Sequence, residues 1–298
     1  MKNILKVICL FLVIASLCSC TSLKSPEYET VDTTTSTTEN QSSTEKPLTT
    51  DTIIVNFGDS IFGNFQDTQG SNKSISSMIA DFTGATVYNC GFGGCKMAYY
   101  SGNTQQLFTM PKLADAIATD DYSLQEEAMS NWTDATFMHK QSFETLKNID
   151  FSKVDIITIS YGTNDYSVSI PIDNSSNQKD IYSFGGALRY SIEKIQKAYP
   201  HIKIFICSPT YRYWVNNGIY TDSNAVTNSN GNLLTDYVEI SKKIATDYNL
   251  IYIDNYYDSG INEDNRTEYF SGNDTTHPNI NGRKRIAENI SRVLIENM

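Results

Sequence analysis

An acid and a base stand three residues apart near the end of the chain, in the stretch Asp274-Thr275-Thr276-His277. A carboxylate at this spacing can orient an imidazole by accepting a hydrogen bond from one ring nitrogen, which leaves the other nitrogen free to take a proton. Pro278 follows directly, and proline is favoured at the start of a helix. The pair is typical of general-base catalysis, in which the imidazole takes a proton from a nucleophile.

The candidate nucleophile is Ser60, which follows Gly58 and Asp59. In an acyl-transfer reaction its hydroxyl would attack a carbonyl, and His277 would take the proton and later return it to the leaving alcohol. Asp274 would orient the imidazole and stabilise its charged form. The three residue types are therefore those of a Ser-His-Asp hydrolase.

Acyl transfer also needs hydrogen-bond donors for the negative oxygen that forms when the carbonyl is attacked. A glycine-rich stretch at 91–94 offers backbone N–H groups, and Asn164 offers a side-chain amide. We predict an oxyanion hole built from the N–H groups of Ser60 and Gly94 and the amide of Asn164. Gly93 is the alternative to Gly94.

Each stretch taken alone has a simpler explanation. Residues 58–60 could form a tight turn that ends in a helix cap, the glycines could be a flexible connection, and Asn164 with Asp165 could form an Asx turn. The chain contains all of these stretches together, and such a coincidence is improbable. Their joint presence therefore favours the catalytic interpretation. His139, in a predicted insertion, and His201, in a predicted turn, are not assigned to the site.

The elements that must position these residues alternate along the chain from residue 52 onward. The predicted strands are Thr52–Phe57, Thr86–Asn89, Asp155–Ser160, Lys203–Cys207 and Leu250–Asp254. The predicted helices are Ile75–Phe82, Ile181–Tyr199, Leu233–Tyr248 and Ile280–Met298. This alternation predicts an α/β fold, a doubly wound, flavodoxin-like parallel sheet of about five strands with helices on both faces.

In such a sheet the ligand crevice lies beyond the carboxyl ends of the strands. Residues 58–61, 89–94 and 162–165 directly follow the first three predicted strands, and Asp274 with His277 lies in a longer loop after the fifth. We therefore expect the four stretches to converge on one crevice. Residues 120–143 and the loop after Asp165 are predicted to be insertions.

These four stretches, in this order and each after a predicted strand, resemble the four sequence blocks of the SGNH hydrolases, also called the GDSL esterase/lipase family. The blocks of that family contribute Ser, Gly, Asn and His, which match Ser60, Gly94, Asn164 and His277 here, and Asp274 stands at the family's Asp-x-x-His position. The resemblance covers roughly residues 52–298. It implies the SGNH hydrolase fold and a carboxylic ester hydrolase that needs no cofactor.

Two positions depart from the family's pattern. Ile61 replaces the Leu that commonly follows the serine, a change of similar volume. Cys95 and Lys96 follow Gly94 where the family often has an acid or small polar residue and a Thr, so the course of this loop is left open. Ser60 lacks the G-x-S-x-G elbow of the α/β-hydrolases, and Lys96 stands where a dinucleotide-binding fingerprint needs its third glycine.

Aromatic side chains near the predicted crevice bear on the substrate. Tyr166 follows the third block, and Tyr211 and Trp214 lie in the loop after the fourth strand. We predict that all three bind substrate, because flat rings with polar edges suit sugar faces. The loops carry few long aliphatic side chains, which favours a small acyl group such as acetyl on a carbohydrate. A lysophospholipase or thioesterase, and a non-catalytic glycan-binding surface lipoprotein, are the alternatives.

Charge and composition narrow the partners further. The formal net charge of the 298-residue chain is -11, which argues against nucleic-acid binding, because the binding of phosphates needs extensive clusters of Lys and Arg. The chain has 3 histidines, scattered without paired spacing, so a metal site is not expected. The expected partner is a small-molecule or glycan ester.

The first residues have the features of an export signal rather than of the folded domain. Lys2 and Lys6 precede an apolar run at 7–17 that is too short to span a bilayer. The following Leu-Cys-Ser-Cys resembles a bacterial lipobox, which implies cleavage before Cys20 and lipidation, including palmitate, of its thiol. A plain signal peptide cut nearby is the alternative.

The predicted domains follow from these features. Residues 1–19 are the signal peptide, 20–51 a disordered tether rich in Ser and Thr, and 52–298 the catalytic domain. This arrangement predicts a protein that is lipid-anchored at Cys20 to the extracytoplasmic face of the cell membrane. Beyond Cys20 only Cys90, Cys95 and Cys207 remain. Cys90 and Cys95 could pair across the glycine-rich loop or stay as free thiols.

Overall fold

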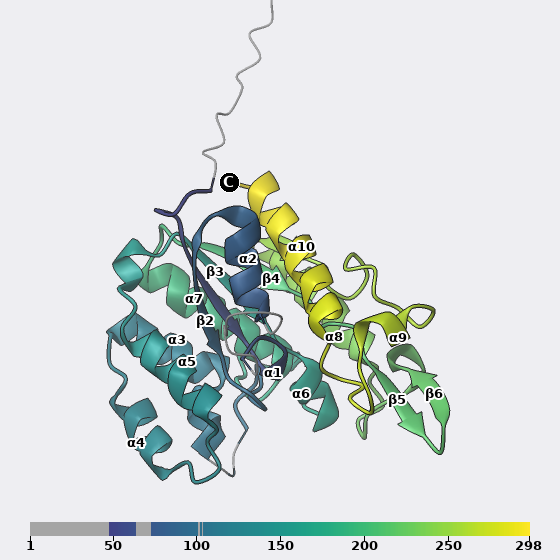
Figure 1. The fold of residues 1–298 in the computed structure, drawn as a ribbon. Coiled ribbons are helices and arrows are strands. Elements are labelled where there is room, and N and C mark those ends of the chain that lie inside the picture. The colour runs from purple at the N-terminus through teal and green to yellow at the C-terminus, as the bar shows by residue number, and fades with distance from the viewer. Residues whose placement is uncertain (1–47, 64–72, 101, 103) are drawn as a thin grey trace, which may run out of the picture. The chain divides into compact units, whose positions relative to one another are not determined.

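The central sheet has five parallel strands in the order β2-β1-β3-β4-β7 (Figure 1). The computed structural model describes residues 48–63, 73–100, 102 and 104–298. The predicted export signal, the lipidation site at Cys20 and the tether up to residue 47 lie outside these residues. The strands are β1 (Ile53–Gly58), β2 (Thr86–Gly91), β3 (Ile156–Ser160), β4 (Lys203–Cys207) and β7 (Ile251–Ile253). The predicted fold class is confirmed, and the ends of the predicted strands differ by at most two residues.

The described helices lie between and after these strands. They are α1 (Ser60–Gly63), α2 (Ile75–Thr83), α3 (Met110–Thr119), α4 (Ser123–Asn131), α5 (Phe137–Lys147), α6 (Thr163–Ser167), α7 (Phe184–Ala198), α8 (Leu234–Asp247), α9 (Arg266–Tyr269) and α10 (Ile280–Glu296). Short 3₁₀ turns occur at Thr104–Phe108, Phe151–Lys153 and Ser223–Ala225. None of these helices is both long and apolar enough to cross a membrane.

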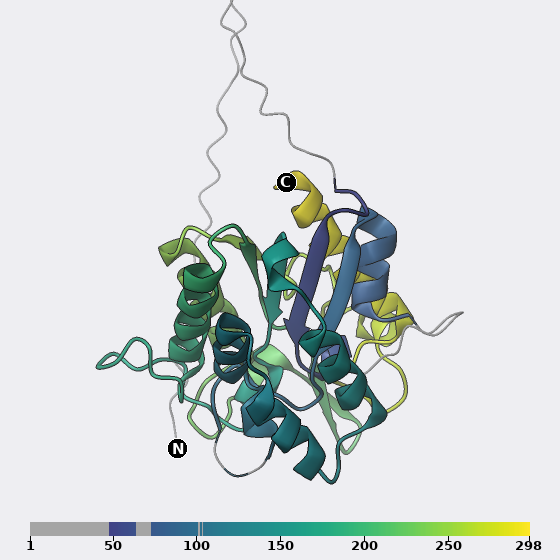
Figure 2. The same ribbon diagram turned by 90° about the vertical axis from the view of Figure 1, so that its left-hand side faces the viewer.

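Helices cover both faces of the sheet. Helices α2 and α10 pack against each other on one face, and α3, α7 and α8 lie on the other (Figures 1 and 2). All five residues of β3 are buried, as expected for a central strand covered on both sides. Helix α5 packs beside β2, at the edge of the sheet. The predicted insertion at 120–143 thus forms the helices α4 and α5.

The carboxyl ends of the strands are level with one another. Gly58 pairs with Gly91 on one side and with Ser160 on the other, and Ser160 pairs with Cys207. Because the strands are parallel and in this register, the loops that follow them leave from the same edge.

A close contact between two glycines places the first of these loops. A Cβ atom on Gly63, the last residue of α1, would lie 2.2 Å from the carbonyl oxygen of Gly91. A side chain at either position would push α1 away from β2. Because both residues are glycines, helix α1 can lie directly against the end of β2, where the glycine-rich loop begins.

The helices α3, α4 and α5 were not predicted from the sequence, and neither was a two-stranded antiparallel sheet formed by β5 (Tyr213–Asn216) and β6 (Ile219–Asp222). Asn217 and Gly218 connect the strands with φ angles of 50° and 77°. Asn-Gly between two runs of β-prone residues is a strong signal for a tight hairpin, and it is present in the sequence. This hairpin lies in the loop that follows β4.

Candidate active site

Ser60 begins α1 directly after β1, and it is 8% exposed. Its Oγ atom lies 2.8 Å from Nε2 of His277. Two residues separated by 217 positions are thus brought into hydrogen-bond contact. This contact is the geometry that a serine nucleophile and its general base require.

His277 is oriented by Asp274, as the spacing of the two residues predicts. The Nδ1 atom of His277 lies 2.9 Å from Oδ2 of Asp274, and Oδ1 of Asp274 accepts hydrogen bonds from the backbone N–H groups of Thr276 and His277 at 3.0 and 2.8 Å. Partial burial raises the pKa of Asp274, but these N–H groups and the imidazole outweigh it, so that the net pKa is lowered. An ionised Asp274 accepts a hydrogen bond from the protonated Nδ1 of His277. The Nε2 atom is then unprotonated and can accept the proton of Ser60.

The acid–base loop is held by the helix that follows it. Asn279 is the N-cap of α10, and its Oδ1 atom accepts from the N–H groups of Asn281 and Gly282. Pro278 precedes this cap, so that the helix starts two residues after the proline. The loop that carries His277 therefore ends in a fixed helix terminus.

Asn164 lies in the first turn of α6, just beyond β3. Its Nδ2 atom donates to the carbonyl oxygen of Cys95 at 3.0 Å, which joins the third loop to the second. An amide nitrogen carries two protons, so the second proton of Nδ2 can serve another acceptor. Asn164 and the glycine-rich loop are thus brought together, and their role as oxyanion donors stays a prediction.

Two peptide groups of the glycine-rich loop are anchored to α5. Nε2 of His139 lies 3.0 Å from the carbonyl oxygen of Gly93, and Oγ of Ser142 donates to the carbonyl oxygen of Gly91 at 2.7 Å. Nδ1 of His139 accepts from the N–H of Thr136 at 3.0 Å, so Nε2 is the protonated nitrogen and donates to Gly93. His139 also stacks on Trp132, with ring centroids 4.3 Å apart.

This anchoring sets the direction of the predicted Gly94 donor. In a planar trans peptide the C=O and N–H groups point in opposite directions. Because the Gly93 carbonyl points to His139, the N–H of Gly94 points away from α5, and it donates to no backbone carbonyl of the described residues. Gly94 has a φ of 75°, which favours glycine at this position.

Two buried carboxyl groups flank the site. Burial raises the pKa of Asp59, next to Ser60, to about 7, although the N–H of Ile61 donates to its Oδ1 at 2.9 Å. Burial likewise raises the pKa of Asp165, next to Asn164, to about 6, although it accepts from the N–H groups of Ala98 and Met97. Asp165 thereby fixes the bend at Met97 and Ala98 after the glycine-rich loop, and its charge also raises the pKa of Asp59.

Arg212 lies between these loops and was not singled out from the sequence. Its guanidinium donates to Oγ of Ser167 at 3.1 Å and stacks over Trp214, with 4.6 Å from Cζ to the ring centroid. Its charge lowers the pKa of Asp59, and burial lowers its own pKa. Within the described residues, its Nε atom is buried without a hydrogen-bond partner.

The three predicted substrate-binding rings have different surroundings. Tyr166 is 3% exposed, and its hydroxyl donates to the carbonyl oxygen of Val226. Trp214 is partly exposed and packs against Tyr166 at 5.6 Å. Tyr211 is also 3% exposed, and its ring lies near Tyr256 rather than near Trp214. Their role in substrate binding stays a prediction.

The thiols of the described residues are free. Cys90, Cys95 and Cys207 are buried and form no disulfide. Burial raises the pKa of Cys95 and of Cys207 to about 12, so these thiols stay protonated. In the described part of the chain no group of three or more His, Cys, Asp or Glu side chains is arranged to hold a metal ion.

Comparison with known proteins gives matches at the levels of family and fold. The GDSL-like lipase/acylhydrolase family matches residues 54–290. A solved structure from Lactobacillus plantarum has 19% identity and a TM-score of 0.56, and the match covers 83% of this chain and 98% of that one. No match was found among curated proteins.

Two further solved structures match over a similar length. A possible lipase from Chitinophaga pinensis has 16% identity and a TM-score of 0.54, with 82% of this chain and 98% of that chain covered. A carbohydrate acetylesterase from Sinorhizobium meliloti has 12% identity and a TM-score of 0.51, with 83% and 100% covered. At these identities the likeness is one of fold.

Proposed function

Because the chain belongs to the GDSL-like lipase/acylhydrolase family and is a carboxylic ester hydrolase, we propose that it removes a small acyl group, preferably acetyl, from a carbohydrate by Ser-His-Asp catalysis. The observation that carries the proposal is the hydrogen-bonded row Ser60, His277 and Asp274, with distances of 2.8 and 2.9 Å. The row lies beyond the carboxyl ends of the parallel strands, where such folds bind ligands.

The first chemical step is an attack by Oγ of Ser60 on the ester carbonyl. The proton of Ser60 passes to Nε2 of His277, and Asp274 stabilises the charged imidazole through Nδ1. When the tetrahedral intermediate collapses, His277 returns the proton to the leaving alcohol, which is the sugar hydroxyl. A water molecule activated by the same nitrogen then hydrolyses the acyl-serine.

The negative oxygen of the intermediate is stabilised by N–H donors that are fixed before the reaction. We assign this role to the backbone N–H groups of Ser60 and Gly94 and to the amide of Asn164. The bonds from His139 to Gly93 and from Asn164 to Cys95 support the assignment, because they hold two of the donors in place. One such donor typically contributes about 3 kcal/mol to transition-state stabilisation.

The preference for a small acyl group is supported by the side chains that follow the strands. Tyr166, Arg212 and Trp214 form a packed row beside the site, which offers aromatic rings and a charge instead of long aliphatic side chains. Trp214 is the ring of this row that stays partly exposed, and it can contact a sugar. A lysophospholipase or thioesterase would require a different surface at this position.

The decisive experiment compares esters on the purified protein and on a Ser60→Ala variant. We expect the wild type to hydrolyse nitrophenyl acetate faster than nitrophenyl octanoate and to release acetate from an acetylated glycan. Ser60→Ala should remove nearly all turnover, and Ser130→Ala, a change at an exposed serine of α4, should leave it unchanged.

Three other results of this experiment would each contradict a different part of the proposed function. More than a tenth of the wild-type rate in pure Ser60→Ala protein would exclude Ser60 as the nucleophile. Faster hydrolysis of octanoyl than of acetyl esters would replace the carbohydrate substrate by a lipid. Glycan binding without any hydrolysis would leave only the non-catalytic lipoprotein.

We further propose that the enzyme is held at the extracytoplasmic face of the cell membrane by lipid on Cys20. The charged start, the short apolar run and the Leu-Cys-Ser-Cys stretch of the sequence support this location. Two or more acyl chains on one residue are enough for stable anchoring.

A further inference from the structure

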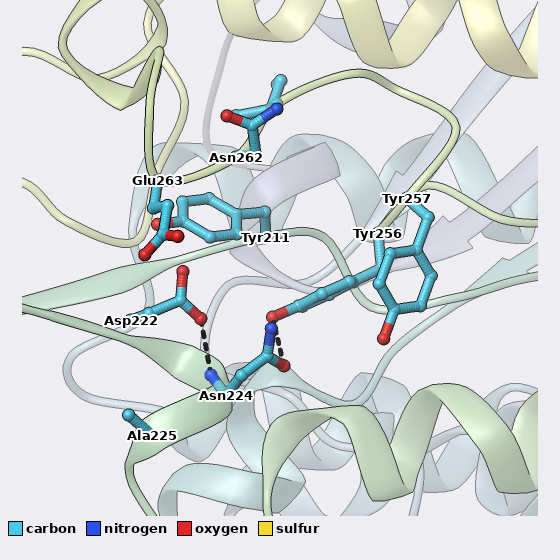
Figure 3. Close-up of a pocket in the computed structure, with 9 residues that line it drawn as sticks. Tyr211, Asp222, Asn224, Ala225, Tyr256, Tyr257, Asn262 and Glu263 are labelled. Carbon is cyan, nitrogen blue, oxygen red and sulfur yellow. Dashed lines mark hydrogen bonds between the residues drawn. The ribbon is translucent and has the colours of Figure 1, made fainter. Parts of the chain in front are cut away.

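A cavity of about 440 Å³ is lined by residues that follow β4 and β7 in the sequence. Figure 3 shows the side chains that line it. Its walls come from Tyr211, from the turn after β6, and from the loop at 256–263 that follows β7. Small-molecule sites typically have volumes of about 300–1,000 Å³, so the cavity can hold a ligand of the size of a sugar residue. We call it the tyrosine pocket after Tyr211, Tyr256 and Tyr257.

The tyrosine pocket is separated from the candidate active site by one short stretch of chain. Arg212 contacts Ser167 and Trp214 beside the active site, whereas its neighbour Tyr211 lines the pocket. The next residue, Tyr213, donates its N–H to the carbonyl oxygen of Thr275, in the loop between Asp274 and His277. The pocket and the candidate active site are therefore neighbours on the two sides of this stretch.

Hydrogen-bond donors line one part of the pocket. Asn224 uses its Oδ1 atom to accept from the hydroxyl of Tyr256 at 2.9 Å, and Asn262 uses its Oδ1 atom to accept from the N–H of Asp264 at 3.0 Å. The amide nitrogens of both residues are thus left as donors. Tyr211 is 3% exposed, and its hydroxyl lies beside the carboxylate of Asp222 without a well-aligned hydrogen bond within the described residues.

Two carboxylates of the tyrosine pocket supply hydrogen-bond acceptors for a ligand. The side chains of Asp222 and Glu263 lie at the hydroxyl end of Tyr211 (Figure 3). Burial is the largest cause that raises the pKa of Tyr211, and the nearby carboxylate of Asp222 raises it further. The hydroxyl of Tyr211 therefore stays protonated and can donate a hydrogen bond. The nine residues that line the pocket include no Lys, Arg or His.

This lining selects one class of ligand by its chemistry. An anion would meet two carboxylates without a lining cation, and an acyl chain would find only Ala225 and Ile261 as aliphatic partners. A sugar hydroxyl can donate to a carboxylate and accept from an amide or a phenol at the same time. Tyr257, 54% exposed and 4.8 Å from Tyr256, offers a ring on which a pyranose can lie.

We propose that the tyrosine pocket binds a neutral pyranose residue of the same glycan whose neighbouring residue presents its ester to Ser60. The proposal rests on the proposed function for the identity of the ligand as a glycan. Binding in the pocket holds the polymer in place while the ester lies at the active site. The pocket therefore contributes to the affinity for polymeric substrates and adds nothing for a small ester.

The test measures binding without turnover, on the full chain carrying Ser60→Ala. Calorimetry is performed with hexasaccharides of β-1,4-linked xylose, glucose, mannose and N-acetylglucosamine, and with a hexamer of galacturonic acid as an anionic probe. We expect at least one neutral hexamer to bind and the anionic one to bind much more weakly. Adding Tyr257→Ala or Glu263→Gln should weaken the binding about tenfold, as the loss of a ring contact or of a charged acceptor would.

Tyr182→Ala is the matched control. Tyr182 is 55% exposed and lies before α7, outside the pocket lining, so its loss should leave binding unchanged. In the active enzyme, Tyr257→Ala should raise KM for acetylated polymer about tenfold while nitrophenyl acetate is hydrolysed at the wild-type rate.

Two results would overturn the pocket assignment, namely no binding of any neutral hexamer and binding that the pocket variants leave unchanged. These results are distinct from a failure of the proposed function. If nitrophenyl acetate is hydrolysed through Ser60 but no hexamer binds, the ester hydrolase stands and the pocket assignment falls. If hexamers bind through Tyr257 but no ester is cleaved, the pocket stands alone.

Discussion

Asp274 decides which nitrogen of His277 can act as a base. Its Oδ2 atom lies 2.9 Å from Nδ1, and its Oδ1 atom is held by two backbone N–H groups. The carboxylate therefore acts on the ring in two ways, by fixing the proton on Nδ1 and by stabilising the positive charge that forms when Nε2 takes the proton of Ser60.

Replacing Asp274 by Asn removes both effects. An amide has one acceptor oxygen, and the two backbone N–H groups hold it, so the NH₂ group faces Nδ1, favours the tautomer with its proton on Nε2 and carries no charge to stabilise the imidazolium. We expect Asp274→Asn to lower kcat on nitrophenyl acetate by about 10²- to 10⁴-fold, and His277→Ala to lower it further. An Asp274→Asn variant with the wild-type kcat would show that another group orients His277.

Asn164 provides a test of the oxyanion hole. Its contact with the substrate oxygen strengthens only as charge develops, so Asn164→Ala should lower kcat by about 10²-fold or more and leave KM nearly unchanged. Steady-state kinetics on a short ester measures both constants. A change in KM alone would assign Asn164 to substrate binding instead.

Asp59 makes the stability of the protein depend on pH in an unusual direction. Its folded pKa of about 7 lies above the ordinary value of 3.8, so between about pH 4 and 7 the folded protein holds a proton that the unfolded chain has released. This group therefore lowers the free energy of unfolding as pH rises through that window, by up to about 4 kcal/mol.

Asp59→Asn should remove this effect. The amide oxygen can still accept from the N–H of Ile61, so we expect the variant to gain stability relative to the wild type as pH rises from 4.5 to 8. Urea unfolding at several pH values measures the difference, and Asp134→Asn, at an exposed position, is the control. A difference that stays constant with pH would contradict the raised pKa.

Among the secondary-structure elements, helices α5 and α6 shape the glycine-rich loop that follows β2. Helix α5 holds the carbonyl groups of Gly91 and Gly93, and α6 carries both Asn164, which holds Cys95, and Asp165, which holds Met97 and Ala98. A loop of glycines has little conformational preference of its own. Its functional shape therefore depends on these two helices.

The contribution of α5 can be measured through His139. Phe at this position keeps a ring to stack on Trp132 but cannot donate to Gly93, so the Gly93–Gly94 peptide is freer to rotate. We expect His139→Phe to lower kcat about tenfold with KM unchanged, and His139→Gln, which keeps a donor, to recover part of the loss.

His201→Phe is the control for this series, because His201 lies in the turn before β4. Circular dichroism checks that each variant is folded. Folded His139→Phe protein with the kcat of the wild type would show that the loop keeps its shape without the histidine.

At the scale of the whole molecule, the described residues form the enzyme, and the proposed anchor lies in the residues before them. A glycan in the cell envelope is accessible to a catalytic domain tethered at the membrane surface. The formal net charge of -11 disfavours close approach to anionic lipid, so lipid on Cys20 would have to supply the attachment.

Substitution of Cys20 tests the anchor. Cys20→Ser should move the protein from the membrane fraction to the soluble fraction and abolish labelling with palmitate, because the thiol that carries the lipid is lost. Cys18→Ser, two residues earlier in the predicted signal, should leave both unchanged. Membrane attachment of the Cys20→Ser protein would contradict lipidation at this residue.

The five strands of the central sheet, the helices α2, α7, α8 and α10, and the order of the polar stretches after the strands could be predicted from the sequence. These features are local, since a buried parallel strand is a short apolar run and the acid–base pair is set by a spacing of three residues. The parallel sheet then brings Ser60 to His277 by a general rule, without details of packing.

Other features depend on contacts that no local pattern reveals. His139 lies in a segment that was predicted to be an insertion, and only the packing of α5 beside β2 places its ring on Gly93. Burial in the tertiary structure raises the pKa values of Asp59 and Asp165, and Tyr211 lines the tyrosine pocket together with segments that are distant in sequence. The burial of a side chain and the identity of its hydrogen-bond partner arise when distant segments pack together, so neither can be predicted from a local pattern.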